Sequence, residues 1–529
     1  MRLVDFYPVQ GTFAPGDKVI LIAEVEAEAH APATLRLSIT HLASTVATLT
    51  QPVSLAPGNR KVTLDWPAPP SAPRGYGAQA ELLDDAGQVL ASVSTAFDVL
   101  PDWTAFPRYG FLTDFSPDRT DAASTVEALA RFHLNGLQFY DWQYRHDRLL
   151  PPNTDYVDPL GRRLSLRIVE EFIEAAHAHG MAAMPYLAVY AASAEFWRAH
   201  PEWALYDAGR RPIPFGENFL GLMNPIADGP WMRHLLAECG RVLATLPFDG
   251  LHVDQYGNPK VAFDAAGQPV DLPAAFAGFV AALKGVHPRA TVLFNAVGNW
   301  PIETLVVSPQ EFAYIEVWPP AISYRDLRQI VTGARAMSKG KPVVIALYLA
   351  ADRPANIRLA DALIFSCGGS RIELGERERL LADPYFPKHQ ALTSELKVAL
   401  RRYYDFAVRY GDLIGPGAAD STEYPAHVPQ GVWAVSRIAR GWLTVCLINM
   451  TGLDGGRWDE AHPAPAPVAD VPVRVVAPRP VHRVWWASPD RDPLELTPAA
   501  WDSEAQDVRA TLPFLDYWAI LAFQLDATE

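Results

Sequence analysis

Cysteine is scarce in this 529-residue chain, and basic residues are outnumbered by acidic ones. The three cysteines, Cys239, Cys367 and Cys446, are too few and too widely spaced to predict a disulfide framework or a zinc site. A count of 45 Lys and Arg against 60 Asp and Glu gives a net charge of -15. Nucleic acid and anionic membrane surfaces are therefore not expected as partners, whereas an uncharged substrate such as a sugar is compatible with this charge.

Long apolar runs are also missing. The best candidate, residues 181–194, is too short to cross a bilayer and contains Pro185. The first eight residues (MRLVDFYP) have neither the apolar core nor the cleavage pattern of a secretory signal. We therefore expect a cytoplasmic protein without a membrane partner, or a secreted one if this chain is a trimmed mature form.

The patterning that is present predicts three domains. Short alternating strands separated by Pro, Gly and Asn turns fill residues 1–103, which indicates an immunoglobulin-like β-sandwich. Apolar strands alternate with helical segments over residues 104–413, and alternating β runs return over residues 414–529, where we expect a second β-sandwich.

The middle segment predicts a (β/α)8 barrel. Its connectors contain amphipathic runs at 164–179, 231–246, 272–286 and 324–337, and a long helical region at 389–410 follows. Strands that are apolar throughout and joined by helices form parallel sheets covered on both faces. A doubly wound open sheet is the alternative, although it would seldom run to eight regular units. The eight expected strands are 109–115, 136–142, 182–190, 250–256, 291–297, 312–318, 342–349 and 362–367.

The predicted strands end on acids, amides and aromatic residues. In such a barrel the functional side chains lie at the carboxyl ends of the strands. Amides and acids bind sugar hydroxyls and aromatic rings stack on pyranose rings, so these ends indicate a sugar site. The candidate substrate-binding residues are Asp114, Tyr140, Asp141, Tyr190, His252, Gln255, Asn295, Trp318, Tyr348 and Glu373.

Two further strand-end acids, Asp254 and Glu316, are the candidate catalytic pair. Glycoside hydrolysis needs one protonated and one ionised carboxyl group. Asp254 stands among polar residues, as a nucleophile of low pKa should, whereas the apolar neighbours of Glu316 predict a raised pKa. The fourth and sixth strands lie two positions apart, so both side chains could share one mouth. An ordinary ion-pair or loop role remains the alternative for each acid.

Other polar residues have simpler interpretations. Asp249 precedes Gly250 at the start of a strand, which indicates a turn residue at the opposite face of the barrel. His252 and Asp254 together could suggest a metal site, but no partner motif accompanies them, so we expect neither a metal nor another cofactor.

Five segments together resemble the dextranase family, glycoside hydrolase family 66. The flanking β regions also match that family's layout. The resemblance implies retaining hydrolysis of α-1,6-glucosidic bonds in dextran, with Asp254 as nucleophile and Glu316 as acid/base. The segments are 108–115 (RYGFLTDF), 135–147 (NGLQFYDWQYRHD), 248–257 (FDGLHVDQYG), 314–318 (YIEVW) and 368–376 (GGSRIELGE).

The same family contains cycloisomaltooligosaccharide glucanotransferases, which transfer the glycosyl group to the end of the chain itself. Those members carry a carbohydrate-binding module inserted late in the barrel, whereas the step from residue 349 to residue 362 is about a dozen residues here. The resemblance therefore favours hydrolysis over transfer. Without a signal segment, isomaltooligosaccharides are as plausible a substrate as dextran. A catalytically silent glycan-binding protein is the remaining alternative.

Overall fold

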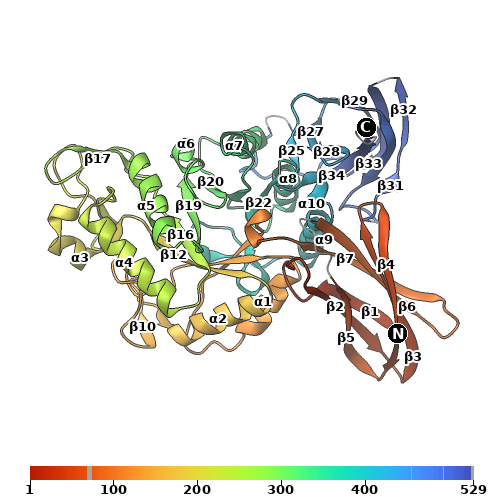
Figure 1. The fold of residues 1–529 in the computed structure, drawn as a ribbon, viewed down its shortest axis with the longest axis horizontal. Helices are drawn as coiled ribbons and strands as arrows, with labels where there is room; N and C mark the ends of the chain where they lie inside the picture. Colours follow the sequence, from red (N-terminus) through yellow and green to blue (C-terminus); the bar gives the residue numbers. More distant parts are fainter. Residues whose placement is uncertain (68–73, 454–455, 493, 505, 526–529) are drawn as a thin grey trace.

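The computed structural model describes residues 1–67, 74–453, 456–492, 494–504 and 506–525. Its centre is a mixed α/β region, and β-sheet regions formed by the two ends of the chain lie together at one side of it (Figure 1). Helix α9 (Ser394–Arg409) lies beside the N-terminal strands, and α10 (Gly411–Ile414) contacts the C-terminal ones. Among the described residues, no helix is both long and apolar enough to span a membrane.

The N-terminal region is a β-sandwich, as predicted. Strands β1-β2-β5 form one sheet and β4-β3-β6-β7 the other. Alternate residues of β3, such as Leu35 and Leu37, are buried, because successive side chains of a strand point to opposite faces. The strands are β1 (Arg2–Pro8), β2 (Lys18–Ala27), β3 (Ala31–His41), β4 (Ser44–Leu55), β5 (Gly58–Pro67), β6 (Arg74–Leu83) and β7 (Val89–Val99).

The central sheet is curled and largely parallel. Its strand order is β22-β21-β20-β19-β16-β12-β9-β8-β23-β24, and only the terminal β23-β24 pair is antiparallel. The strands are β8 (Tyr109–Leu112), β9 (Gly136–Phe139), β12 (Ala182–Ala188), β16 (Gly250–Asp254), β19 (Thr291–Val297), β20 (Ala313–Glu316), β21 (Val343–Ala346), β22 (Gly369–Ile372), β23 (Leu374–Gly375) and β24 (Arg379–Leu380).

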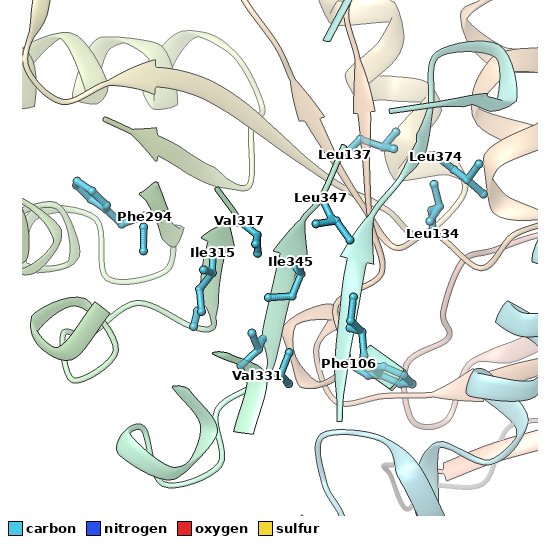
Figure 2. Packing of buried hydrophobic residues seen from close by; sticks show 14 of the residues in the cluster. Phe106, Leu134, Leu137, Phe294, Ile315, Val317, Val331, Ile345, Leu347 and Leu374 are labelled. Carbon is cyan, nitrogen blue, oxygen red and sulfur yellow. The ribbon is translucent and has the colours of Figure 1, made fainter. Parts of the chain in front are cut away.

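Helices cover the outer face of this sheet, and the four predicted connector helices are confirmed. Helix α2 buries Ile168, Val169, Phe172 and Ile173, which recur at the helical period. Figure 2 shows Ile315 and Ile345 of neighbouring strands beside Val331 of α7. The helices are α1 (Ala122–Ala130), α2 (Leu166–Ala178), α3 (Ala194–Ala199), α4 (Pro230–Thr245), α5 (Leu272–Val286), α6 (Ile302–Leu305), α7 (Tyr324–Met337) and α8 (Pro354–Ser366), with 3-10 turns at Trp103–Ala105, Pro201–Trp203, Glu376–Glu378 and Phe386–Lys388.

The eighth strand was predicted in the wrong place. Residues 362–367 belong to the end of α8 and its cap, and the strand is β22, which begins at Gly369. Helix α8 is apolar because it packs against α7, α9, β22 and the C-terminal strand β28 (Trp442–Asn449). A short apolar run does not distinguish a buried helix from a buried strand, which explains the error.

The C-terminal region is also built from packed β-sheets, as predicted. Strands β25-β27-β28-β34-β30-β31 form one sheet and β26-β29-β33-β32 the other, with a shared apolar core. The remaining strands are β25 (Ala419–Asp420), β26 (Ala426–His427), β27 (Val432–Ala439), β29 (Val468–Val476), β30 (Val481–Ala487), β31 (Thr497–Pro498), β32 (Ala500–Glu504), β33 (Asp507–Leu515) and β34 (Trp518–Leu525). The three predicted domain boundaries remain predictions.

Small strand pairs decorate the loops of the central region. A three-stranded sheet between β12 and α4 places Phe215 and Phe219 near the carboxyl ends of the central strands. These strands are β10 (Asp155–Val157), β11 (Arg163–Ser165), β13 (Ala191–Ser193), β14 (Pro214–Phe215), β15 (Leu220–Leu222), β17 (Ala262–Phe263) and β18 (Pro269–Val270).

Candidate active site

A cavity of about 390 Å³ opens at the carboxyl ends of the central strands. Asp254, the last residue of β16, and Glu316, the last residue of β20, both line it. Strand β19 lies between these two strands, so the predicted spacing of two positions is confirmed. The parallel register brings both side chains to the same mouth.

Asn295 of β19 joins the two acids. Its side-chain nitrogen Nδ2 donates one hydrogen bond to Asp254 Oδ1 and another to Glu316 Oε2, each 2.8 Å long. Those two carboxylate oxygens therefore cannot be farther apart than twice that distance. The amide uses both of its hydrogens on the pair and so fixes the orientation of both carboxyl groups.

Three more donors hold the outer oxygens of the pair. The Tyr186 hydroxyl donates to Asp254 Oδ2 at 2.9 Å. Glu316 Oε1 accepts from the indole nitrogen of Trp318 at 2.9 Å and from the Tyr348 hydroxyl at 2.8 Å. Each carboxyl group is thus held at both oxygens, which limits its rotation.

Burial sets the electrostatics of the two acids. Loss of hydration raises the pKa of Glu316. The pKa of Asp254 is raised to about 7, by burial first and by the negative charge of Glu316 second. This differs from the predicted low pKa of Asp254, because its polar neighbours do not offset the loss of water. The Glu316 contribution disappears when Glu316 carries a proton, so the pair favours one shared proton near neutral pH.

Aromatic rings form the walls of the cavity. Tyr140 stacks on Phe386 with ring centroids 4.5 Å apart, and Tyr256 stacks on Phe215 at 4.1 Å. Such exposed ring faces suit the apolar faces of sugar rings. Trp318, 39% exposed, stands at the rim.

Asp141, another predicted residue, lines the cavity in a constrained backbone conformation. Its φ of +51° lies in the left-handed region, which is uncommon for a residue other than glycine. Burial raises the pKa of its carboxyl to about 6, although the nearby Arg162 guanidinium opposes this shift. Strained backbone of this kind is concentrated at functional sites.

His252 and Gln255 also border the cavity but contact the protein itself. His252 is 1% exposed, its Nδ1 lies 3.2 Å from the Tyr109 hydroxyl, and burial lowers its pKa to about 3. Gln255 Oε1 accepts from the Gly257 amide at 2.6 Å. We infer that His252 stays neutral and that Gln255 shapes the loop after β16.

Three predicted side chains lie outside the cavity lining: Asp114, Tyr190 and Glu373. Asp114 Oδ1 accepts from the backbone amide of Ser116. The Tyr190 hydroxyl accepts from the Tyr256 amide at 2.8 Å and so supports the cavity wall. Glu373 is fully buried and paired with Arg371.

The sequence analysis missed several residues of the lining. Gln138, Gln143 and His146 lie in the quoted segment 135–147, so a signal for them existed. Phe219 and Tyr385 come from loops whose sequence has no period or motif. Within the described parts of the chain, no group of three or more His, Cys, Asp or Glu side chains is arranged to hold a metal ion.

Comparison with known proteins identifies the family. The model of glycosyl hydrolase family 66 matches residues 10–522. The chain belongs to this family. A cycloisomaltooligosaccharide glucanotransferase of Niallia circulans is 30% identical over 341 residues, which are 59% of this chain and 34% of that protein. A dextranase of Streptococcus salivarius is 21% identical over 475 residues, 73% of this chain and 57% of that protein.

Solved structures of family 66 and other glycosidases share the fold. The structure of a Paenibacillus cycloisomaltooligosaccharide glucanotransferase, complexed with cycloisomaltoheptaose, superposes with a TM-score of 0.91 at 23% identity, over 98% of this chain and 99% of that one. An α-amylase of Thermotoga neapolitana gives a TM-score of 0.53 at 11% identity, over 80% of this chain and 99% of that one. The chain spans about a third of the length of the curated glucanotransferases that it matches. Family membership makes this protein an enzyme of the glycoside hydrolase class.

Proposed function

We propose that this protein is a retaining glycoside hydrolase that cleaves α-1,6-glucosidic bonds of dextran or isomaltooligosaccharides. The observation that carries the proposal is the Asn295 bridge between Asp254 and Glu316. Retaining enzymes hold their two carboxyl groups about 5–5.5 Å apart, and inverting enzymes about 6.5–9.5 Å. Two oxygens that each lie 2.8 Å from one nitrogen fit only the shorter separation.

The proposed scaffold is a complete (β/α)8 barrel. Strand β22 pairs with β21, and β23, which follows it after Glu373, pairs with β8. The pairing of Gly375 with Phe111 links the last parallel strand of the sheet to the first. These pairings support a closed ring with its active residues at the carboxyl ends of the strands.

In the proposed mechanism Glu316 holds the shared proton and Asp254 is ionised. Asp254 attacks the anomeric carbon while Glu316 gives its proton to the leaving glycosidic oxygen, which forms a covalent glycosyl-enzyme. Glu316 then takes a proton from water as the water oxygen attacks the same carbon, and Asp254 leaves. Tyr348 suits both states of Glu316, because a hydroxyl can donate to the carboxylate or accept from the acid.

The substrate class follows from the family and the cavity. Relatives named dextranase and cycloisomaltooligosaccharide glucanotransferase support an α-1,6-glucan. The stacked walls formed by Tyr140 and Phe215, together with the buried carboxyl pair, suit an uncharged sugar chain.

The test is product analysis on dextran and isomaltopentaose. The wild type should release reducing sugar whose first-formed anomer is α, measured by proton NMR, and Asp254→Ala and Glu316→Gln should each lose most of this activity. A β product would contradict retention. Full activity in Asp254→Ala would show that another residue is the nucleophile.

Transfer to a second sugar is the alternative activity, because two relatives are named as glucanotransferases. Cyclic isomaltooligosaccharides in the product mixture, seen by mass spectrometry as species smaller by one water, would favour it. A protein that binds dextran but releases and transfers no sugar would be a glycan-binding member of the fold.

A further inference from the structure

A second hollow lies directly beside the active-site cavity. Its volume is about 320 Å³, and Trp318 borders both spaces. The hollow lies between the turn after β19, the loop after β20 and the beginning of α7. All three segments follow the carboxyl ends of the central strands or begin beside them, so the hollow opens on the same face as the cavity.

The position of the hollow relative to the two acids is asymmetric. Trp318 donates from its indole nitrogen to Glu316 Oε1 at 2.9 Å. On the other side, the amide of Gly298 donates to the backbone oxygen of Glu316 at 2.8 Å. Both borders of the hollow are therefore attached to Glu316. In the mechanism above this residue protonates the leaving oxygen, so the leaving part of the substrate must extend on its side.

The lining of the hollow suits one neutral sugar unit. Trp318 is 39% exposed, and its nitrogen is engaged, which leaves a ring face for stacking. Val317, Pro320 and Ile330 add apolar surface. Asp326, the acid of the lining, already accepts from the backbone amides of Ile322 and Ser323 in the cap of α7, so the hollow offers no free charge from it.

Two amide side chains provide the polar contacts. Asn299 Oδ1 is buried in this lining and has no hydrogen-bond partner among the described residues. A buried acceptor without a partner carries a desolvation cost that a ligand hydroxyl would relieve. Asn299 also has a φ of +58°, in the left-handed region, and so keeps the turn after β19 tight. Gln329 is exposed on the facing side of α7.

We propose that this hollow is the acceptor subsite, which binds the glucosyl unit on the leaving side of the scissile bond. The proposal rests on the proposed function and on Glu316 as its acid. In hydrolysis the leaving unit vacates the hollow and water enters. In transfer, the 6-hydroxyl oxygen of a sugar bound there attacks the anomeric carbon, its proton passes to Glu316, and the bond from that carbon to Asp254 breaks. Occupancy of the hollow therefore decides between the two outcomes.

The test compares two donors in the variant Asn299→Gly/Gln329→Ala. Glycine keeps the left-handed backbone of residue 299 and removes only its amide. An isomaltooligosaccharide with 4-nitrophenol as its leaving group places no sugar in the hollow, whereas isomaltopentaose does. We expect nitrophenol release to stay within about twofold, and kcat/KM on isomaltopentaose to fall about fivefold or more, the effect of losing one hydrogen bond or two.

Asn218→Gly is the matched control, because Asn218 also has a positive φ, 52°, but lies outside both lining sets. The ratio of transfer to hydrolysis at high isomaltopentaose concentration should fall in the double variant and not in the control. An unchanged preference for isomaltopentaose over the aryl donor in the double variant would overturn the proposal. Absence of both reactions in the wild type would instead refute the proposed function.

Discussion

At the scale of single residues, Asn295 is the side chain on which the carboxyl pair depends. Asn295→Ala removes a donor from each acid, and two buried carboxylates then face each other without it. We expect kcat to fall about 100-fold, the loss typical of removing one preorganised donor, with a much smaller change in KM. Because the amide lowers the pKa of both acids, its removal should move the acidic limb of the kcat/KM profile to higher pH.

Gln310→Ala provides the control for this prediction. Gln310 Oε1 accepts from the amide of Phe294, the residue before Asn295 on the same strand, but it does not touch the carboxyl pair. Loss of stability in β19 alone would affect both variants similarly. Equal pH profiles for Asn295→Ala and the wild type would contradict a positioning role.

Two tyrosines should act on different limbs of the pH profile. The Tyr348 hydroxyl stabilises ionised Glu316, so Tyr348→Phe raises the pKa of the acid/base and extends activity to higher pH. The Tyr186 hydroxyl stabilises ionised Asp254, so Tyr186→Phe raises the pKa of the nucleophile and reduces activity at low pH. Profiles of kcat/KM between pH 4 and 9 measure both shifts. The opposite pattern would reverse the two assigned roles.

These residues also show how far the sequence alone reaches. Asp254 and Glu316 stand out because each ends an apolar strand, and the barrel rule then places them in one mouth. Their pKa values could not be predicted in the same way. Asp254 has polar sequence neighbours, yet its actual surroundings come from Tyr186, Asn295 and Glu316, on three other strands or their ends.

At the scale of elements, the eighth strand is tied to α8 by a buried charge cluster. Arg371 of β22 contacts both Asp361 of α8 and Glu373. Burial raises the pKa of both acids, that of Glu373 to about 8, so Glu373 is protonated at neutral pH. The cluster then contains one cation and one anion, which is the balanced arrangement for a buried site.

This balance gives opposite expectations for two substitutions. Arg371→Met leaves two acids without a cation, and the free energy of unfolding should fall by about 3–5 kcal/mol at pH 7. Their folded pKa values then rise further, so stability is present at low pH and is lost as pH increases. Glu373→Gln mimics the protonated acid and should change stability by less than about 1 kcal/mol. Urea unfolding at pH 5 and pH 8 checks both, and a large loss in Glu373→Gln would refute the protonation assignment.

The sequence predicted most elements but not the connection before β22. Helices α5 and α7 have the predicted bounds because each has one buried face and one polar face, a pattern that is visible in the sequence. Helix α8 is buried nearly all round by α9 and the C-terminal sheet, so its sequence lacks that contrast. Phe215, on a short hairpin strand, is likewise brought to the cavity by tertiary packing alone.

At the scale of the whole molecule, catalysis and domain attachment lie at opposite ends of the central strands. The cavity is at the carboxyl ends, whereas the N-terminal sandwich attaches near the amino end of β9 through Asp405 of α9. Asp405 Oδ1 accepts from the Thr95 hydroxyl at 2.9 Å and from the Ala96 amide at 3.1 Å, and it lies 2.8 Å from His133 Nε2. One buried carboxylate thus joins the sandwich, α9 and the central region.

Asp405→Ala should therefore loosen the N-terminal sandwich without removing activity. The pKa of Asp405 is lowered, because Arg401 and His133 outweigh its burial. Its stabilising effect is thus present above the unfolded pKa of about 3.9 and is lost as pH falls below it. At pH 7 we expect a loss of about 3–5 kcal/mol, since the substitution leaves buried donors unpaired. Hydrogen exchange should increase in residues 74–99, while kcat at 25 °C stays within about twofold. Asp412→Ala, a half-buried acid that accepts from the Gly75 amide, is the control and should cost less. Unchanged exchange in residues 74–99 would show that Asp405 does not hold the sandwich, and loss of kcat without unfolding would show that the two ends of the barrel are coupled.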